Sequence, residues 1–195
     1  MRRKVWHILA LTLVFLPAGC GTAVFDDFAP LLPVDNFAVI ESERAYRSAQ
    51  VDRTTLAMMI DNLELKTVIN LRGANPSEQW YINEKAVCDE KGVTLVDIRW
   101  SARELPSQEE LLKYYDAIKS VQEPILIHCK AGADRTGAAA AIWRMTIPGE
   151  ARETARFQLN PFYGHFQAFT PYMDELVAIY QTSRDWIVNE YTGMP

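Results

Sequence analysis

The stretch of sequence that decides the fold reads Ile125-Leu126-Ile127-His128-Cys129-Lys130-Ala131-Gly132-Ala133-Asp134-Arg135-Thr136-Gly137. Its apolar first residues are typical of a buried strand, and a small-residue loop separates them from Ala138–Trp143, a strong helix-forming run. A strand, a loop and a helix in this order aim backbone N–H groups and the positive end of a helix dipole at one point. The pattern therefore predicts an anion-binding loop with a cysteine at its entry and an arginine at its exit.

The sequence on either side of this stretch alternates between strand and helix patterns. Further strands are predicted at residues 37–40, 45–48, 67–71 and 93–98, the first two of which can pair as a hairpin. Helices are predicted from a cap at Asp52 or Thr54 to Leu63, over 76–92, over 107–121 with a capping box of Ser107 and Glu110, over 151–159 and over 170–180. Such alternation predicts an α/β fold with a mostly parallel central sheet and helices on both faces.

Length and composition indicate one well-buried domain. The chain has 195 residues, of which 49% are hydrophobic, and this suffices for a single core. A net charge of −5 and the lack of a basic, aromatic-rich tract argue against a nucleic-acid partner. The three cysteines are too few for a disulfide scaffold and lack the paired spacing of a zinc site.

The N-terminus has the pattern of an export signal. A basic start, residues 1–4, precedes an apolar run, residues 5–16, that is too short to span a bilayer permanently. Together with Gly19 and Cys20 it resembles a bacterial lipoprotein signal, although Pro17 stands where such signals usually carry leucine. We therefore predict a signal peptide over 1–19, a lipidated Cys20, a tether over 20–36 and a folded domain over 37–195. The protein would be a membrane-anchored lipoprotein facing the periplasm or the cell exterior. The alternative is an ordinary cleaved signal and a soluble periplasmic or secreted protein.

The residue types of the loop suit attack on phosphorus. Converging N–H groups and Arg135 would lower the pKa of the Cys129 thiol from about 8.5 to between roughly 3.5 and 7.5, which gives a nucleophilic thiolate. The planar guanidinium of Arg135 suits two oxygens of a phosphoryl group. Thr136 can donate a hydrogen bond to the thiolate, and His128 can orient the loop. The predicted phosphate-binding residues are Lys130, Ala131, Gly132, Ala133, Asp134 and Arg135.

The string His-Cys-x-x-Gly-x-x-Arg-Thr-Gly, residues 128–137, resembles the signature of the cysteine-dependent protein tyrosine phosphatase superfamily. Residues 46–50 and 67–72 resemble its compact dual-specificity branch, and the likeness runs from about Phe37 to about Tyr180. The resemblance implies a phosphomonoesterase that works through a cysteinyl-phosphate and needs no metal or organic cofactor. Phosphotyrosine proteins are the default substrate, with phosphoserine and phosphothreonine as further options and phosphoinositides as the main competitor.

Such an enzyme also needs a general acid, and the sequence leaves its identity open. No Trp-Pro-Asp occurs. Asp97 lies at roughly the distance before the cysteine at which dual-specificity enzymes place their acid. Asp134, inside the loop, resembles the proposed acid of myotubularin-type lipid phosphatases and some secreted bacterial phosphatases, and it is the preferred candidate. Glu104 is a third candidate.

Other residues have a functional and a structural interpretation. Cys88 resembles in placement the cysteine that forms a reversible disulfide with the nucleophile in phosphoinositide phosphatases, or is a buried apolar residue. Lys130 can attract a highly charged substrate or face solvent, and Arg72 can border the pocket or form a salt bridge. His165 is interpreted as a packed, hydrogen-bonded histidine. Two other functions use a comparable loop, namely a non-catalytic phosphate-binding module and rhodanese-type sulfur transfer.

Overall fold

The computed structural model describes residues 35–193. In that range five strands form one sheet, β1 (Ala38–Glu41), β2 (Ala45–Ser48), β3 (Thr67–Asn70), β4 (Thr94–Asp97) and β5 (Ile125–His128), in the order β1-β2-β5-β3-β4. The β1–β2 pair is antiparallel and all other neighbours are parallel. This confirms the predicted α/β fold and the hairpin formed by its first two strands.

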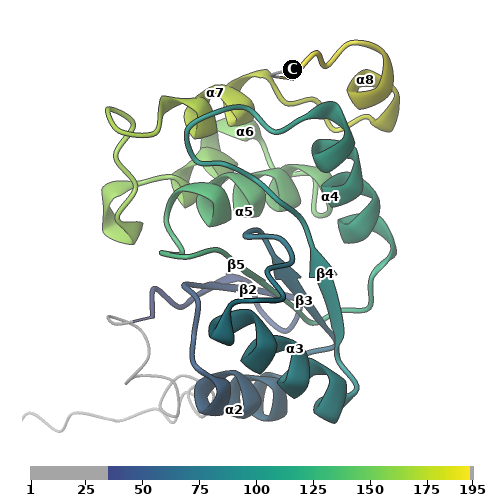
Figure 1. The fold of residues 1–195 in the computed structure, drawn as a ribbon. Coiled ribbons are helices and arrows are strands. Elements are labelled where there is room, and N and C mark those ends of the chain that lie inside the picture. The colour runs from purple at the N-terminus through teal and green to yellow at the C-terminus, as the bar shows by residue number, and fades with distance from the viewer. Residues whose placement is uncertain (1–34, 194–195) are drawn as a thin grey trace, which may run out of the picture.

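Helices cover both faces of this sheet (Figure 1). On one face lie α2 (Arg53–Leu63) and α3 (Gln79–Lys91); the other carries α4 (Gln108–Ser120), α5 (Asp134–Thr146), α6 (Arg152–Ala155), α7 (Pro171–Ile179) and α8 (Arg184–Asn189). Two short 3-10 helices, η1 (Arg156–Gln158) and η2 (Pro161–Tyr163), connect α6 to α7. None of the helices within residues 35–193 is both long and apolar enough to cross a membrane.

The strands are buried on both sides, as parallel strands between helix layers must be. Val68 and Leu126 belong to the core under α2 and α3, whereas their neighbours Ile69 and Ile127 belong to the core under α5. This alternation follows from the two-residue repeat of a strand. The alanines of α5 (residues 138–141) are fully buried, and side chains this small let the helix lie close to the strand that precedes it.

The parallel register aligns polar residues at the carboxyl ends of the strands. Ser48 of β2 and Asn70 of β3 both pair with His128 of β5, and Asn70 also pairs with Asp97 of β4. The cysteine loop leaves the sheet from this row. The carboxyl edge of a parallel sheet is where such folds generally place their ligand sites.

Helix boundaries agree with the sequence in most places. The caps at Asp52 and Ser107 are confirmed, because each side chain accepts a hydrogen bond from an amide in the first turn of its helix. The other half of the predicted capping box is wrong, since the Glu110 carboxylate accepts from the amide of Arg99 instead. The helix predicted over 151–159 is divided into α6 and η1, and α8 was not predicted.

The predicted signal peptide over 1–19, Cys20 and most of the 20–36 tether lie outside the described residues.

Candidate active site

The loop after β5 exposes its amides and satisfies its carbonyls. The carbonyl oxygen of Lys130 accepts from the Gln50 amide, that of Ala131 from the Asn36 side chain, and that of Gly132 from Arg47 Nη2 at 2.6 Å. By contrast, the amides of residues 130–135 donate no backbone hydrogen bond to any described residue. A ring of carbonyls turned outward leaves free N–H groups on the inner side of the loop. The loop is therefore built to bind an anion.

Gly132 lets the loop pack against β2. Its φ is +68°, and a Cβ there would stand 2.6 Å from the Ala49 amide nitrogen and 2.8 Å from the Ser48 carbonyl oxygen. Both obstacles are backbone atoms, so no side chain can move aside for them. Glycine is therefore required at this position by close contact as well as by its φ.

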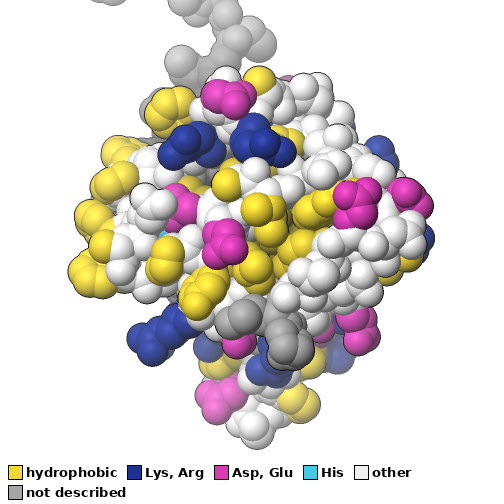
Figure 2. All heavy atoms as spheres, turned by 90° about the horizontal axis from the view of Figure 1, so that it is seen from above, with side chains coloured by type: hydrophobic (Ala, Val, Ile, Leu, Met, Phe, Trp, Pro, Cys, Tyr) yellow, Lys and Arg dark blue, Asp and Glu magenta, His cyan; other side chains and the backbone are white. Residues whose placement is uncertain are grey.

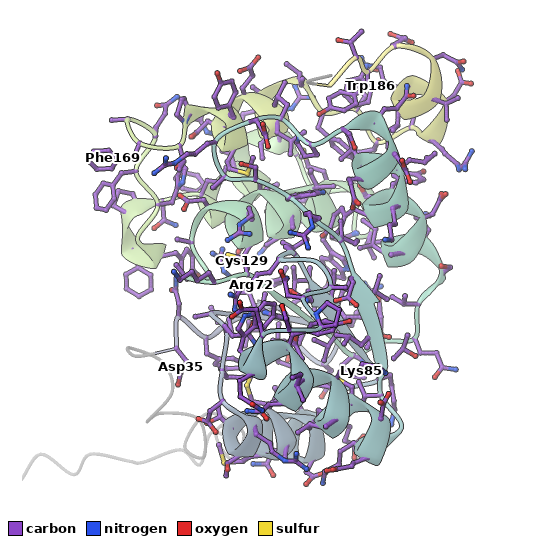
Figure 3. The ribbon with its side chains drawn as sticks, viewed as in Figure 1. Asp35, Arg72, Lys85, Cys129, Phe169 and Trp186 are labelled. Carbon is purple, nitrogen blue, oxygen red and sulfur yellow. The ribbon has the colours of Figure 1, made fainter. Side chains whose placement is uncertain are left out.

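Cys129 lies at the entry of the loop, with only 2% of its surface exposed. Its thiol is free of any disulfide, as is that of Cys88. Figure 3 shows Cys129 and Arg72 close together where the loop meets the sheet. Two further donors are present nearby along the chain: the buried Arg135 Nε and Thr136 Oγ1 have no hydrogen-bond partner among the described residues. Buried donors that lack a partner are costly, and an anion in the loop would satisfy them.

Among the described residues, Arg135 forms hydrogen bonds through its Nη1 group alone. This nitrogen donates to the carbonyls of Leu71 and Trp100, at 3.3 and 3.2 Å. Neither contact neutralises the guanidinium charge, because both acceptors are neutral backbone groups. The arginine predicted to clamp a phosphoryl group is thus oriented but still available for it.

His128 supports the entry of the loop through a contact with Glu84, a residue that the sequence analysis did not single out. Its Nε2 lies 2.8 Å from Oε1 of Glu84 on α3, and both side chains are 2% exposed, although the direction of this contact does not make a hydrogen bond. The same carboxylate oxygen accepts from Gln50, whose own oxygen accepts from Arg72. Glu84 therefore ties α3 to the entry of the loop and to the turn after β2.

Asp134 points toward His165 and the start of α7. Its Oδ1 lies 2.7 Å from His165 Nδ1 and accepts from Thr170 Oγ1 at 2.7 Å. On its far side, His165 Nε2 lies 2.8 Å from Asp174. Burial raises the pKa of Asp134, but the hydrogen bonds from His165 and Thr170 outweigh it and hold the pKa below its usual value. A carboxylate kept ionised in this way is poorly suited to donate a proton at neutral pH.

The carboxylate of Asp97, like that of Asp134, already accepts hydrogen bonds from neighbouring side chains. Its two oxygens accept from Asn70 Nδ2 at 2.8 Å and from the Tyr81 hydroxyl at 2.6 Å. Burial, followed by the bond to Asp97, raises the pKa of Tyr81 to about 12, so this hydroxyl stays a donor. Asp97 is the last residue of β4, and these two hydrogen bonds join it to β3 and α3, which is a structural role.

Two cavities meet at Arg135. One, of about 630 Å³, is lined by the segment before α4, from Arg99 to Ser107. Its only lining carboxylate is Glu104, which is exposed and has no ion pair or hydrogen bond within the described part of the chain. The other, of about 400 Å³, has the cations Arg72 and Lys130 beside Arg135, and the carboxylate Glu78 also lines it. Arg72 lies 3.4 Å from the centre of the Trp80 ring, and this stacking fixes its direction. Arg72 thus borders the pocket, one of its two predicted roles.

Arg47 is a second supporting residue that sequence reasoning missed. It is fully buried, and it donates to the Gly132 carbonyl and to Gln158 while its guanidinium lies 3.9 Å from the Tyr163 ring centre. Burial lowers its pKa to about 10, which leaves it charged at neutral pH. The Tyr46-Arg47-Ser48 segment marked this position by family resemblance, but only the fold connects it to the loop.

Cys88 has the environment of a buried structural residue. It is fully buried on α3, and burial, with the negative charge of Glu84, raises its pKa to about 12. A thiol of this kind forms little thiolate at neutral pH and reacts slowly. His165, by contrast, is confirmed as a packed and hydrogen-bonded histidine.

Comparison with known proteins agrees with this geometry. Residues 28–168 match the family PTP-NADK, described as a DSP-PTPase phosphatase fused to NAD+ kinase. The fold is similar to that of TpbA of P. aeruginosa, at 21% identity over 80% of this chain and 93% of that one, with a TM-score of 0.62. A TpbA variant in complex with pTyr matches at 19% identity over 80% and 98%, with a TM-score of 0.60.

The core catalytic domain of the PP-IP phosphatase SIW14 from S. cerevisiae matches at 20% identity over 80% of this chain and 91% of that one, with a TM-score of 0.64. A comparison with curated proteins found no match. At such identities the solved structures establish the fold, whereas the family match spans most of the chain. The chain belongs to this family of DSP-PTPase phosphatases and is a cysteine-dependent phosphatase.

Proposed function

We propose that this phosphatase hydrolyses phosphate monoesters through a phosphoryl group carried on Cys129. The observation that carries the proposal is the loop that begins at Cys129, directly after β5. Its carbonyls point outward, its amides are free of backbone partners, and two buried donors, Arg135 Nε and Thr136 Oγ1, have no hydrogen-bond partner among the described residues. In the first step the Cys129 thiolate bonds to phosphorus, the ester P–O bond breaks, and an acid protonates the leaving oxygen. In the second, water attacks phosphorus, the P–S bond breaks, and inorganic phosphate leaves.

Phosphate hydrolysis is tested with an aryl phosphate and three proteins: wild type, Cys129→Ser and Arg135→Lys. We expect Cys129→Ser to abolish turnover, because serine has no accessible anion at neutral pH. Arg135→Lys keeps the charge but loses the planar fork, so its turnover should fall strongly while the fold is retained. Binding of phosphate without turnover by the wild type would favour the non-catalytic module, and faster reaction with thiosulfate would favour sulfur transfer.

We further propose Glu104 as the general acid, in place of the expected Asp134 or Asp97. The support is that both aspartates already accept two side-chain hydrogen bonds, whereas Glu104 is unpaired and shares a cavity with Arg135. Glu104→Gln should slow hydrolysis of an alkyl phosphate by about 10²- to 10⁴-fold. It should slow hydrolysis of a nitrophenyl phosphate far less, because that leaving group needs no proton. If Asp134→Asn or Asp97→Asn showed a larger difference between the two substrates than Glu104→Gln, that aspartate would be the general acid instead.

A substrate with a second anionic group beside the scissile phosphate is the second candidate, next to a phosphotyrosine protein. The cavity that joins Arg72, Lys130 and Arg135 favours it, because these three cations outnumber the one carboxylate of the lining, Glu78. Arg72 and Lys130 form no ion pair in the described residues. A phosphoinositide or a polyphosphorylated small molecule has this chemistry. A panel of phosphopeptides and phosphoinositides with Lys130→Ala separates the options: only multiply anionic substrates should lose kcat/KM by more than about tenfold.

Export and lipid anchoring at Cys20 are proposed from the sequence of residues 1–20. Replacement of Cys20 by alanine should abolish acylation and release the protein from the membrane fraction. Membrane association and acylation that persist in Cys20→Ala would contradict the anchor.

A further inference from the structure

Four phenylalanines project into solvent from the segment that begins with η1 and ends just before α7. Phe157, Phe162, Phe166 and Phe169 are 69%, 88%, 49% and 79% exposed, whereas the other exposed large apolar residues described are spread over separate helices. We call these four residues the phenylalanine surface. Figure 3 shows Phe169 at one side of the molecule, pointing away from it, and Figure 2 shows hydrophobic side chains gathered at that same side. Concentrated apolar exposure of this kind marks an interaction surface.

The backbone beneath the phenylalanine surface is held firmly. Asn160 caps η2 by accepting from the Phe162 amide at 2.8 Å. His165, which is 2% exposed, is fixed between Asp134 and Asp174. The aromatic rings are therefore presented from an anchored segment, and contact with a partner would order few additional residues.

The N-terminal segment enters the domain beside this surface. Asn36 donates to the carbonyl of Tyr163, the residue after Phe162, at 2.8 Å, and also to that of Ala131 in the phosphate loop. Figure 3 shows Asp35 and Phe169 on the same side of the molecule. Residues 21–34 span at most about 50 Å when fully extended. A chain anchored at Cys20 would thus keep the domain within about this distance of the bilayer, and it would be attached on the side that carries the phenylalanine surface.

We propose that the phenylalanine surface inserts into the interfacial region of the lipid bilayer that carries the anchor. Aromatic side chains on the apolar face of a peripheral protein bind at this depth, and nearby cations attract anionic headgroups. Arg156, next to Phe157, and Lys130, next to Ala131, are exposed and have no ion pair within residues 35–193. The inference rests on the proposed location at a membrane, and its test does not depend on catalysis.

Insertion of the phenylalanine surface would also bring the active site close to the bilayer surface. Gly164 stands close to Ala133, and His165 contacts Asp134, so the inserted segment packs directly on the phosphate loop. Phosphorylated groups at or near the bilayer surface would then be within reach of Cys129.

Hydrogen exchange of the full chain, measured with and without vesicles of phosphatidylethanolamine and phosphatidylglycerol, tests the proposal. We expect vesicles to slow exchange of the amides over 157–169 and to leave those of α3, which carries the exposed Ile82, unchanged. Vesicle-bound protein with no slowing over 157–169 would overturn the proposal. Slowing that is already present without lipid would also overturn it, because a second copy or residues 1–34 would then cover the surface.

A matched pair of variants separates insertion from a general loss of structure. Phe162→Ser with Phe169→Ser should lose the lipid-dependent protection while keeping aryl phosphate turnover. Ile82→Ser with Val188→Ser removes two exposed apolar side chains elsewhere and should keep the protection. Equal loss of protection in both double variants would contradict a specific surface.

Discussion

The two ends of the phosphate loop are each supported by a buried histidine and carboxylate, and the two contacts differ in solvent access. At the entry, His128 meets Glu84 at 2.8 Å and both side chains are 2% exposed. At the exit, His165 is 2% exposed but its partners Asp134 and Asp174 are 25% and 21% exposed. The entry contact is sealed between sheet and helix, whereas water reaches the carboxylates of the exit contact.

This difference indicates how each contact works. A sealed carboxylate cannot be replaced by water, so the entry contact fixes the position of the cysteine rigidly. The exit contact joins α5 to α7 through charges that solvent partly screens. We therefore expect the entry to dominate stability and the exit to respond to pH.

Glu84→Ala should have the largest effect. Removing one member of a buried pair costs about 3–5 kcal/mol in the free energy of unfolding, because His128 loses its adjacent carboxylate and Gln50 loses its acceptor. Urea unfolding measures this cost. Glu90→Ala on the same helix removes an exposed ion pair with Arg53 and should cost no more than about 1 kcal/mol. Equal costs for the two variants would contradict the sealed entry.

His165→Gln should have a smaller and pH-dependent effect. Burial lowers the pKa of His165, but the hydrogen bonds and charges of Asp134 and Asp174 outweigh it and raise the pKa above 6.5. The stabilisation is therefore complete below the unfolded pKa and is lost as the pH rises through the raised pKa. Near pH 6 the substitution should cost about 1.5–3 kcal/mol.

The same unfolding experiment repeated at pH 9, an alkaline value about 2.5 units above the unfolded pKa of His, should give a smaller difference between wild type and His165→Gln. A difference that grows with pH would show that the neutral imidazole is the stabilising form.

Gly132→Ala, between the two ends, separates loop shape from both contacts. Its positive φ alone should cost about 1–3 kcal/mol, and the clash with the Ala49 and Ser48 backbone should also displace the loop and reduce kcat. Gly149→Ala is the matched control, because its φ is +74° and a Cβ there meets no atom within 4 Å. Unfolding and aryl phosphate turnover distinguish the two, since only Gly132→Ala should lose kcat. Unchanged kcat in Gly132→Ala would show that loop shape is not critical.

The sequence predicted the layers of the fold because local patterns determine them. Apolar runs, the Asp52 and Ser107 caps and the Gly92 stop all act within a few residues. The split of the predicted 151–159 helix into α6 and η1 was not predictable in this way. There the backbone carbonyl of Gln158 accepts from the distant Arg47, and a Cβ at Gly137 would stand 2.7 Å from that carbonyl oxygen.

In the active site, too, the sequence predicted what local patterns determine and missed what depends on distant contacts. Cys129, Arg135 and the glycine between them form one contiguous motif, so the sequence sufficed to place them together. Glu84 and Arg47 act on the loop from α3 and β2, and no local pattern connects them to it. The acid depended on which carboxylate is already hydrogen-bonded, and that is a property of the tertiary structure. The hydrogen bonds of Asp134 and Asp97 weigh against the sequence-based choice, which stays a prediction until the variants are compared.

Trapping the phosphoryl-enzyme tests the central claim most directly. Protein mixed with an aryl phosphate and quenched in acid should carry one phosphoryl group on the peptide that contains Cys129, as detected by mass spectrometry. Cys129→Ser should carry none and should not turn over substrate. Turnover that persists in Cys129→Ser, with no modified Cys129 peptide in the wild type, would contradict the account.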